Sequence, residues 1–220
     1  MEDRRHEEDA VAARQQDGAG TVGVVGARGG AGATVLAALL AARLARKGAT
    51  ALVDGGPGPS IDTVLGLESH PGLRWPGLSG ARGVVDPALL AGNLMRWDRC
   101  AVLPADDSQP GPPRPDVVPD VLDALTVAHR SVVVDLDRSG LLREDPTGAR
   151  VLADACATVL VLAPRDVTGV AGARLLRDVL VRDGRRVGLV AGGAAPAVLA
   201  PEEVAAAVGL PVVGALPRAR

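Results

Sequence analysis

Short runs of valine, leucine and alanine alternate along this chain with longer segments that carry apolar residues at helical spacing. Nearly continuous apolar runs are typical of strands covered on both faces, as in a parallel sheet. They predict about seven strands, over residues 21–25, 50–54, 100–103, 131–135, 158–163, 187–191 and 212–215. Helical patterns lie between them, over residues 35–44, 118–129, 167–181 and 201–208. The alternation predicts a single doubly wound α/β domain with a mostly parallel sheet flanked by helices.

The two ends of the chain differ from this pattern. Residues 1–20 are charged and then rich in glycine and alanine, which predicts a disordered tail. The folded domain is expected over residues 21–217, with a short tail at residues 218–220. The N-terminal segment lacks the apolar stretch of a signal peptide, and no apolar run reaches the ~18 residues of a membrane span. These features favour a cytoplasmic protein.

Composition narrows the chemistry that the chain can perform. Its 220 residues include two Trp, no Tyr and no Phe, and Lys47 is the only lysine. Reactions that need a tyrosine are therefore excluded. The net charge of −2 gives no basic surplus, so nucleic acid is not an expected partner. The three histidines and two cysteines are scattered and show no metal-binding spacing.

A glycine-rich segment follows the first predicted strand and leads into the first predicted helix. It reads GARGGAGAT over residues 26–34 and has four glycines among its first seven residues. Such a turn can direct several backbone N–H groups at one anion, and the start of the helix adds a partial positive charge. The segment therefore predicts a phosphate-binding site.

One candidate family for this segment is the short-chain dehydrogenases. Gly26, Gly30 and Gly32 match their GxxxGxG pattern, and Asp54 at the end of the second strand is placed to hold a ribose hydroxyl. Their catalysis needs a tyrosine, which this chain lacks. Non-catalytic dinucleotide binding on a Rossmann-type domain remains one alternative.

The same segment resembles the P-loop of the ParA/MinD superfamily, KGGxGK[ST]. In that register Arg28 stands at the superfamily's signature lysine, Ala33 replaces the lysine that grips phosphate, and Thr34 matches the hydroxyl that binds magnesium. The resemblance continues in two strands that end in Asp54 and Asp135. It implies that Asp54 acts near the attacking water and that Asp135 lies beside the magnesium ion. It also implies ATP or ADP with Mg²⁺ as the cofactor. Its nucleotide-binding residues would be Arg28, Gly29, Gly30, Gly32, Ala33, Thr34, Asp54 and Asp135.

A narrower resemblance comes from the segment GLRWPGLSGARG, residues 72–83. It is similar to actinobacterial CpaE-like, septum-site-determining proteins, relatives of the CpaE/TadZ factors that position Tad (Flp) pili. The resemblance implies a localisation or assembly factor with partners in division or in pilus and secretion machinery, recruited to a pole or septum. A homodimer is also implied. The chain stops after the last predicted strand, so direct membrane insertion through a C-terminal amphipathic helix is not expected.

The missing lysine at position 33 bears directly on catalysis. The P-loop lysine neutralises charge on the phosphates, which is a large part of phosphoryl-transfer catalysis. We therefore expect weak or absent nucleotide binding and little or no ATP hydrolysis, with Asp54 the one candidate catalytic residue. The alternative is an active ATPase that cycles between a monomer and a nucleotide-bound dimer.

Overall fold

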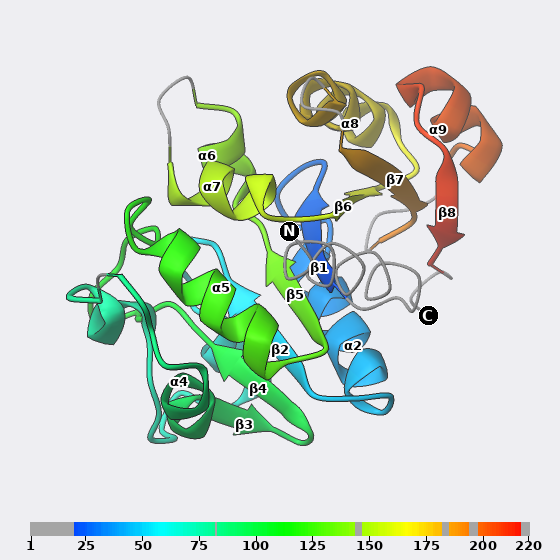
Figure 1. Ribbon diagram of the computed structural model, residues 1–220. Helices are drawn as coiled ribbons and strands as arrows, with labels where there is room; N and C mark the ends of the chain where they lie inside the picture. Colours follow the sequence, from blue (N-terminus) through cyan, green and yellow to red (C-terminus); the bar gives the residue numbers. More distant parts are fainter. Residues whose placement is uncertain (1–19, 82, 144–146, 182–184, 194–197, 217–220) are drawn as a thin grey trace, which may run out of the picture.

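The protein is built around one eight-stranded sheet flanked by helices on both faces (Figure 1). The computed structural model describes residues 20–81, 83–143, 147–181, 185–193 and 198–216. The strands are β1 (Gly20–Gly26), β2 (Thr50–Asp54), β3 (Met95–Trp97), β4 (Cys100–Leu103), β5 (Ser131–Asp135), β6 (Thr158–Ala163), β7 (Arg186–Ala191) and β8 (Val212–Ala215). Their order is β3-β4-β2-β5-β1-β6-β7-β8, and all pairs are parallel except β3 with β4.

Successive residues of the central strands face opposite sides of the sheet and build two separate cores. Val25, Val53 and Val134 belong to the larger core, while their neighbours Val24, Leu52 and Val133 belong to the smaller one. All six are fully buried. This explains the unbroken valine and leucine runs, because a strand covered on both faces has no solvent side for polar residues.

Helices divide between the two cores. Residues of α2 (Ala33–Ala45) and α3 (Ile61–Leu65) pack in the smaller core. The larger core takes in α4 (Pro87–Asn93), α5 (Val118–Ala128), α7 (Gly148–Asp154), α8 (Val167–Leu180) and α9 (Pro201–Val208). In Figure 1, α5 lies in front of the sheet and α2 behind it. No helix in the described residues is both long and apolar enough to span a bilayer.

Sequence patterns predicted most of this architecture. All seven predicted strands and all four predicted helices are present, with ends that agree to within two residues. The predicted tails, residues 1–20 and 218–220, lie outside the described residues, except for Gly20. Short helical turns also form in segments that carried no periodic pattern: α3, α4, the 3-10 turn η1 (Trp75–Leu78), α6 (Arg138–Leu141) and α7.

The eighth strand, β3, was not predicted. It has only three residues and pairs with β4 as an antiparallel edge hairpin, which Asp98 turns with a left-handed φ of 52°. A three-residue strand with exposed Arg96 at its centre has no apolar run to reveal it. The pairing depends instead on the neighbouring strand.

The strand order also argues against the alternative of a Rossmann-type, dinucleotide-binding domain. In a Rossmann-type sheet the first two strands are neighbours. Here β5 lies between β1 and β2. The glycine loop after β1 therefore has the Asp135 end of β5 beside it, and the dehydrogenase-type arrangement does not apply.

Candidate functional site: a glycine-loop cleft at the carboxyl ends of β1, β2 and β5

The glycine-rich loop joins β1 to α2 with a backbone that depends on two glycines. Gly30 and Gly32 have φ angles of 70° and 97°, in the region that side chains rarely adopt, and Gly32 caps the start of α2. A Cβ at Gly29 or Gly30 would meet no atom within 4 Å. The loop is therefore curled at the start of a helix with open space beside it, which is the arrangement that binds phosphate.

This loop forms one wall of a cleft of about 460 Å³. The other walls are the segment after β2, residues 56–59, and the segment after β5, residues 135–139. All eight predicted site residues line the cleft: Arg28, Gly29, Gly30, Gly32, Ala33, Thr34, Asp54 and Asp135. They meet because the carboxyl ends of adjacent parallel strands share one edge of the sheet.

Asp135 and Thr34 form the polar centre of the cleft. The Thr34 hydroxyl lies near the Asp135 carboxylate and favours its charged form. The pKa of Asp135 is raised to about 7, chiefly by burial and to a smaller extent by the nearby carboxylates of Asp54 and Asp137, against the lowering effect of the Thr34 hydroxyl. A buried carboxyl group beside other carboxyl groups favours a cation.

Magnesium suits this pair of residues. Mg²⁺ is usually held by one or two carboxylates together with waters and substrate phosphates. Thr34 and Asp135 supply one hydroxyl and one carboxylate next to a loop shaped for phosphate. Within the described ranges, no three histidine, cysteine, aspartate or glutamate residues gather as a metal site. One hydroxyl and one carboxylate fit a magnesium ion that completes its coordination with waters and phosphate oxygens.

Asp54 is held differently from Asp135. Its side chain is 3% exposed, and its two oxygens accept backbone N–H bonds from Gly56 at 3.0 Å, Ile61 at 2.8 Å and Ala105 at 3.3 Å. Burial raises its pKa, while these three bonds lower it. Both oxygens thus hold the segment after β2 against the chain that follows β4. In this conformation Asp54 shapes the cleft wall, with three of the about four acceptor sites of its carboxylate occupied by backbone N–H groups.

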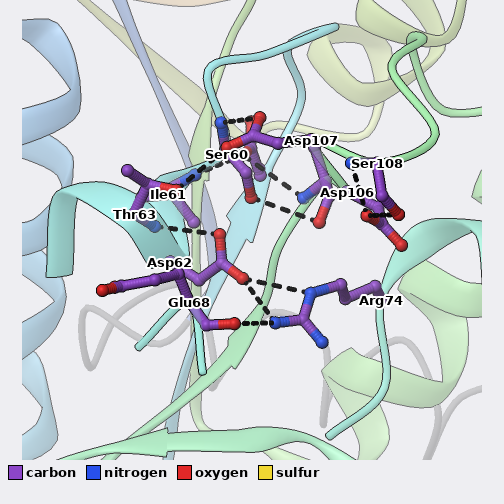
Figure 2. A network of polar contacts seen from close by, with 11 residues as sticks. Ser60, Ile61, Asp62, Thr63, Glu68, Arg74, Asp106, Asp107 and Ser108 are labelled. Carbon is purple, nitrogen blue, oxygen red and sulfur yellow. Dashed lines mark hydrogen bonds and ion pairs between the residues drawn. The ribbon is translucent and has the colours of Figure 1, made fainter. Parts of the chain in front are cut away.

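A polar network in the chain that follows β2 and in the loop after β4 extends this bracing (Figure 2). Arg74 donates through Nε and Nη2 to the buried Asp62, at 3.1 and 2.8 Å. Ser60 donates its N–H to Asp107 at 2.8 Å and its hydroxyl to the carbonyl of Ala105 at 3.2 Å. The cleft wall is therefore tied to the segment that contains Arg74 and to the loop after β4.

Trp75 connects the same segment directly to β2. Its indole N–H donates to the backbone oxygen of Asp54 at 2.7 Å, and the residue is 6% exposed. Trp75 of the GLRWPGLSGARG segment is thus a core residue, bonded to the end of β2 beside the cleft. The network was missed at the sequence level because its partners lie up to 47 residues apart.

We expect Trp75→Phe to lower the free energy of unfolding by about 1–2 kcal/mol, because it leaves the buried Asp54 carbonyl without its indole donor. Urea unfolding followed by circular dichroism measures this loss. Trp97→Phe is the control, since the indole N–H of half-buried Trp97 has no acceptor among the residues that the structure describes. Equal losses in the two variants would contradict a specific role for the bond to Asp54.

Arg28 does not reach into open space. Its Nη2 pairs with Asp166 at 3.2 Å. Asp166 also caps α8 by accepting the Gly169 N–H at 2.7 Å. The Arg28 Nε is buried without an acceptor in the described part of the chain. The arginine at the signature position is thus held by its own chain, a partner that sequence spacing did not predict.

Comparison with other proteins places the fold. No family model matches the sequence. An uncharacterized protein of Mycobacterium tuberculosis H37Rv, Rv3660c, is 33% identical over 215 residues. The match covers 94% of this chain and 58% of that protein, so the chain spans less than three fifths of its relative's length.

Solved structures resemble the whole described domain. MinD in the MinC:MinD cell division complex of Aquifex aeolicus superposes with a TM-score of 0.71, 18% identity, and coverage of 90% of this chain and 81% of that chain. A ParA family ATPase from Chlorobium tepidum superposes with a TM-score of 0.69 and 16% identity, over 91% of this chain and 85% of that chain. MinD of Pyrococcus horikoshii complexed with Mg-ADP superposes with a TM-score of 0.64 and 16% identity, over 90% of this chain and 80% of that chain. The chain therefore has the ParA/MinD type of P-loop ATPase fold, a single mostly parallel sheet with flanking helices and a glycine loop after β1.

Proposed function

We propose that this chain is a nucleotide-responsive localisation or assembly factor of the ParA/MinD type that binds Mg-ATP or Mg-ADP weakly and hydrolyses ATP little or not at all. The observation that carries the proposal is the loop itself. It has the glycine backbone, Thr34 and Asp135 for a magnesium–phosphate group, but Ala33 at the position of the phosphate-gripping lysine.

The balance of retained and missing groups supports binding over catalysis. Backbone amides, a helix start and a magnesium pair can hold phosphates without doing chemistry. Hydrolysis needs charge stabilisation that grows in the transition state, and losing one such donor typically costs about 10²–10³ in rate. Asp54, the candidate for positioning water, is engaged with three backbone N–H groups.

The cellular role is proposed from the similarity of this fold to solved structures. Neighbours in fold include MinD bound to MinC, a cell division complex, and ParA-type ATPases. Together with the CpaE-like segment at residues 72–83, this favours protein partners in division or in pilus and secretion machinery. The retained Thr34–Asp135 pair favours one second candidate, an ATPase that cycles between a monomer and a nucleotide-bound dimer.

Calorimetric titration of the protein with Mg-ADP, with the non-hydrolysable analogue AMPPNP and Mg²⁺, and with NAD tests the binding step. We expect weak binding of both adenine nucleotides and none of NAD. Phosphate release from ATP tests the second candidate. A magnesium-dependent turnover that Thr34→Ala abolishes would establish the ATPase and overturn the non-catalytic proposal, while no binding of either adenine nucleotide would overturn both.

We expect Ala33→Lys to restore what the loop lacks. A lysine at the first position of α2 would place an ammonium group at the glycine loop and should tighten AMPPNP binding about 10-fold or more. ATP hydrolysis should rise in the same variant. Ala33→Met adds comparable length without charge and should do neither. Equal affinity in the wild type and the lysine variant would show that the missing lysine does not limit binding.

A further inference from the structure

The cleft contains an arginine that the loop pattern does not include. Arg138 is the first residue of α6 and comes three residues after Asp135. Its Nε donates to the carbonyl oxygen of Ala27, in the first turn of the glycine loop, at 2.9 Å. The side chain is half-buried and lines the cleft. One nitrogen of the guanidinium is thus fixed to the loop.

The charges of the cleft leave this arginine uncompensated. Arg28 and Arg138 are the cations among the described residues that line it. Arg28 is paired with Asp166 at 3.2 Å. Arg138 forms no ion pair within the described part of the chain, and its single hydrogen bond there is to a neutral carbonyl. A guanidinium has five N–H groups, so four remain available for an acceptor.

Neighbouring carboxylates are engaged elsewhere. Asp137, the adjacent residue, accepts the N–H groups of Ser139 at 3.0 Å and Gly140 at 2.8 Å and so caps α6. Asp135 has the Thr34 hydroxyl nearby and forms no ion pair within the described part of the chain. Charges removed from bulk water are ordinarily paired. An unpaired, half-buried guanidinium at the wall of a phosphate-shaped cleft therefore points to an anion supplied by the ligand.

We propose that Arg138 supplies, to the phosphate groups of the bound nucleotide, the positive charge that Ala33 does not provide. The inference rests on the proposed function, because it names a binding residue of that same cleft. A guanidinium binds phosphate oxygens in pairs, through charge-assisted hydrogen bonds. The bond to Ala27 holds the side chain in place before the ligand arrives, which lowers the entropic cost of binding. The cation thus enters from the β5 side of the cleft and not from α2.

Titration with AMPPNP and Mg²⁺, compared among variants, tests this role. Arg138→Gln removes the charge but keeps an amide donor for the Ala27 carbonyl, and should weaken binding about 10- to 100-fold. Arg138→Lys keeps a charge and should recover part of that loss. Arg99→Ala, on the exposed β3–β4 turn, removes the same unit of charge away from the cleft and should bind like the wild type.

Two further readouts separate a phosphate contact from a structural role. The affinity of Arg138→Gln should fall less steeply with added salt than that of the wild type, because one charged contact is missing. Its melting temperature should stay within a few degrees of the wild-type value. Equal affinity of wild type and Arg138→Gln would overturn the inference and leave the proposed function standing. Failure of the wild-type protein itself to bind AMPPNP would overturn the proposed function and this inference together.

Discussion

Gly172→Ala is expected to lower the free energy of unfolding by about 3 kcal/mol or more, since overpacking against atoms that cannot move costs at least the usual 1–3 kcal/mol. A Cβ at position 172 would lie 1.9 Å from the carbonyl oxygen of Ala27. That oxygen belongs to the backbone of the glycine loop, so no side-chain rotation relieves the clash. Either α8 or the loop must shift.

The same substitution should disturb the cleft. Gly169 and Gly172 are three residues apart and face the same side of α8, and a Cβ at Gly169 would lie 2.1 Å from the carbonyl oxygen of Pro164. Gly172 lets α8 approach the glycine loop closely, and Gly169 lets the start of α8 pack on Pro164, which follows β6. Asp166, just before α8, pairs with Arg28 in this arrangement. A shift of the loop would move Ala27, to which Arg138 is bonded, so AMPPNP binding should weaken as well.

Gly92→Ala provides the matched control. Gly92 lies within α4, and a Cβ there would meet no atom within 4 Å. Alanine should stabilise this helix by about 0.5–1 kcal/mol, because glycine loses more backbone freedom on folding. Guanidinium unfolding and AMPPNP titration on both variants measure the contrast. If Gly172→Ala unfolded at the wild-type denaturant concentration, the close packing of α8 on the loop would be refuted.

The second large effect concerns the Asp135 carboxyl group and pH. Burial raises the pKa of Asp135 to about 7, whereas an unfolded aspartate has a pKa of about 3.9. Between these values the folded protein keeps a proton that the unfolded chain releases. The stabilising contribution of the protonated group is therefore complete below about pH 4 and is lost as the pH rises towards 7. At and above neutral pH the ionised carboxylate destabilises the fold.

Asp135→Asn removes that ionisation and is expected to raise the free energy of unfolding at pH 8 by about 2–4 kcal/mol, from a shift of about 3 units at 1.36 kcal/mol each. At pH 4 the variant and the wild type should differ little. Urea unfolding at several pH values measures the difference. The exposed Asp123→Asn is the control and should follow the wild type at every pH.

The opposite result, a variant less stable than wild type at pH 8, would mean that Asp135 is stabilised as an anion by its surroundings. The expected result has a functional meaning. A cation bound to a buried carboxylate stabilises its charged form, and Thr34 beside Asp135 supplies a second oxygen for that ion. Magnesium binding should then recover part of the lost stability.

The pattern of apolar residues and glycines along the sequence was sufficient to predict the strands of the sheet and the glycine loop. The apolar runs of β1, β2 and β5 predict buried parallel strands because a residue run of that kind must be covered on both faces wherever it lies. The glycines of residues 26–32 predict the phosphate loop because glycine readily adopts the left-handed φ angles found at Gly30 and Gly32, which other residues rarely adopt. The meeting of Thr34, Asp54 and Asp135 in one cleft follows from parallel strands sharing an edge.

Features that depend on distant partners could not be predicted in this way. The strand β3 exists through its pairing with β4, and its three residues carry no signal of their own. Asp54 ends a strand as Asp135 does, yet it is enclosed by backbone N–H groups that arrive from Ile61 and Ala105. Arg28 bonds Asp166, which lies 138 residues away in the sequence, and Arg138 bonds Ala27, which lies 111 residues away.

The division has a physical basis. Strand and loop propensities are properties of a few consecutive residues, so they can be detected before the fold is known. The charge state and availability of a side chain depend on which donors, acceptors and carboxylates the folded chain brings within about 3 Å, the range of a hydrogen bond. The residue types at the cleft were therefore visible in the sequence. Which of these side chains are already bonded and which are available to a ligand is decided by three-dimensional packing, as at Asp54, Asp135, Arg28 and Arg138.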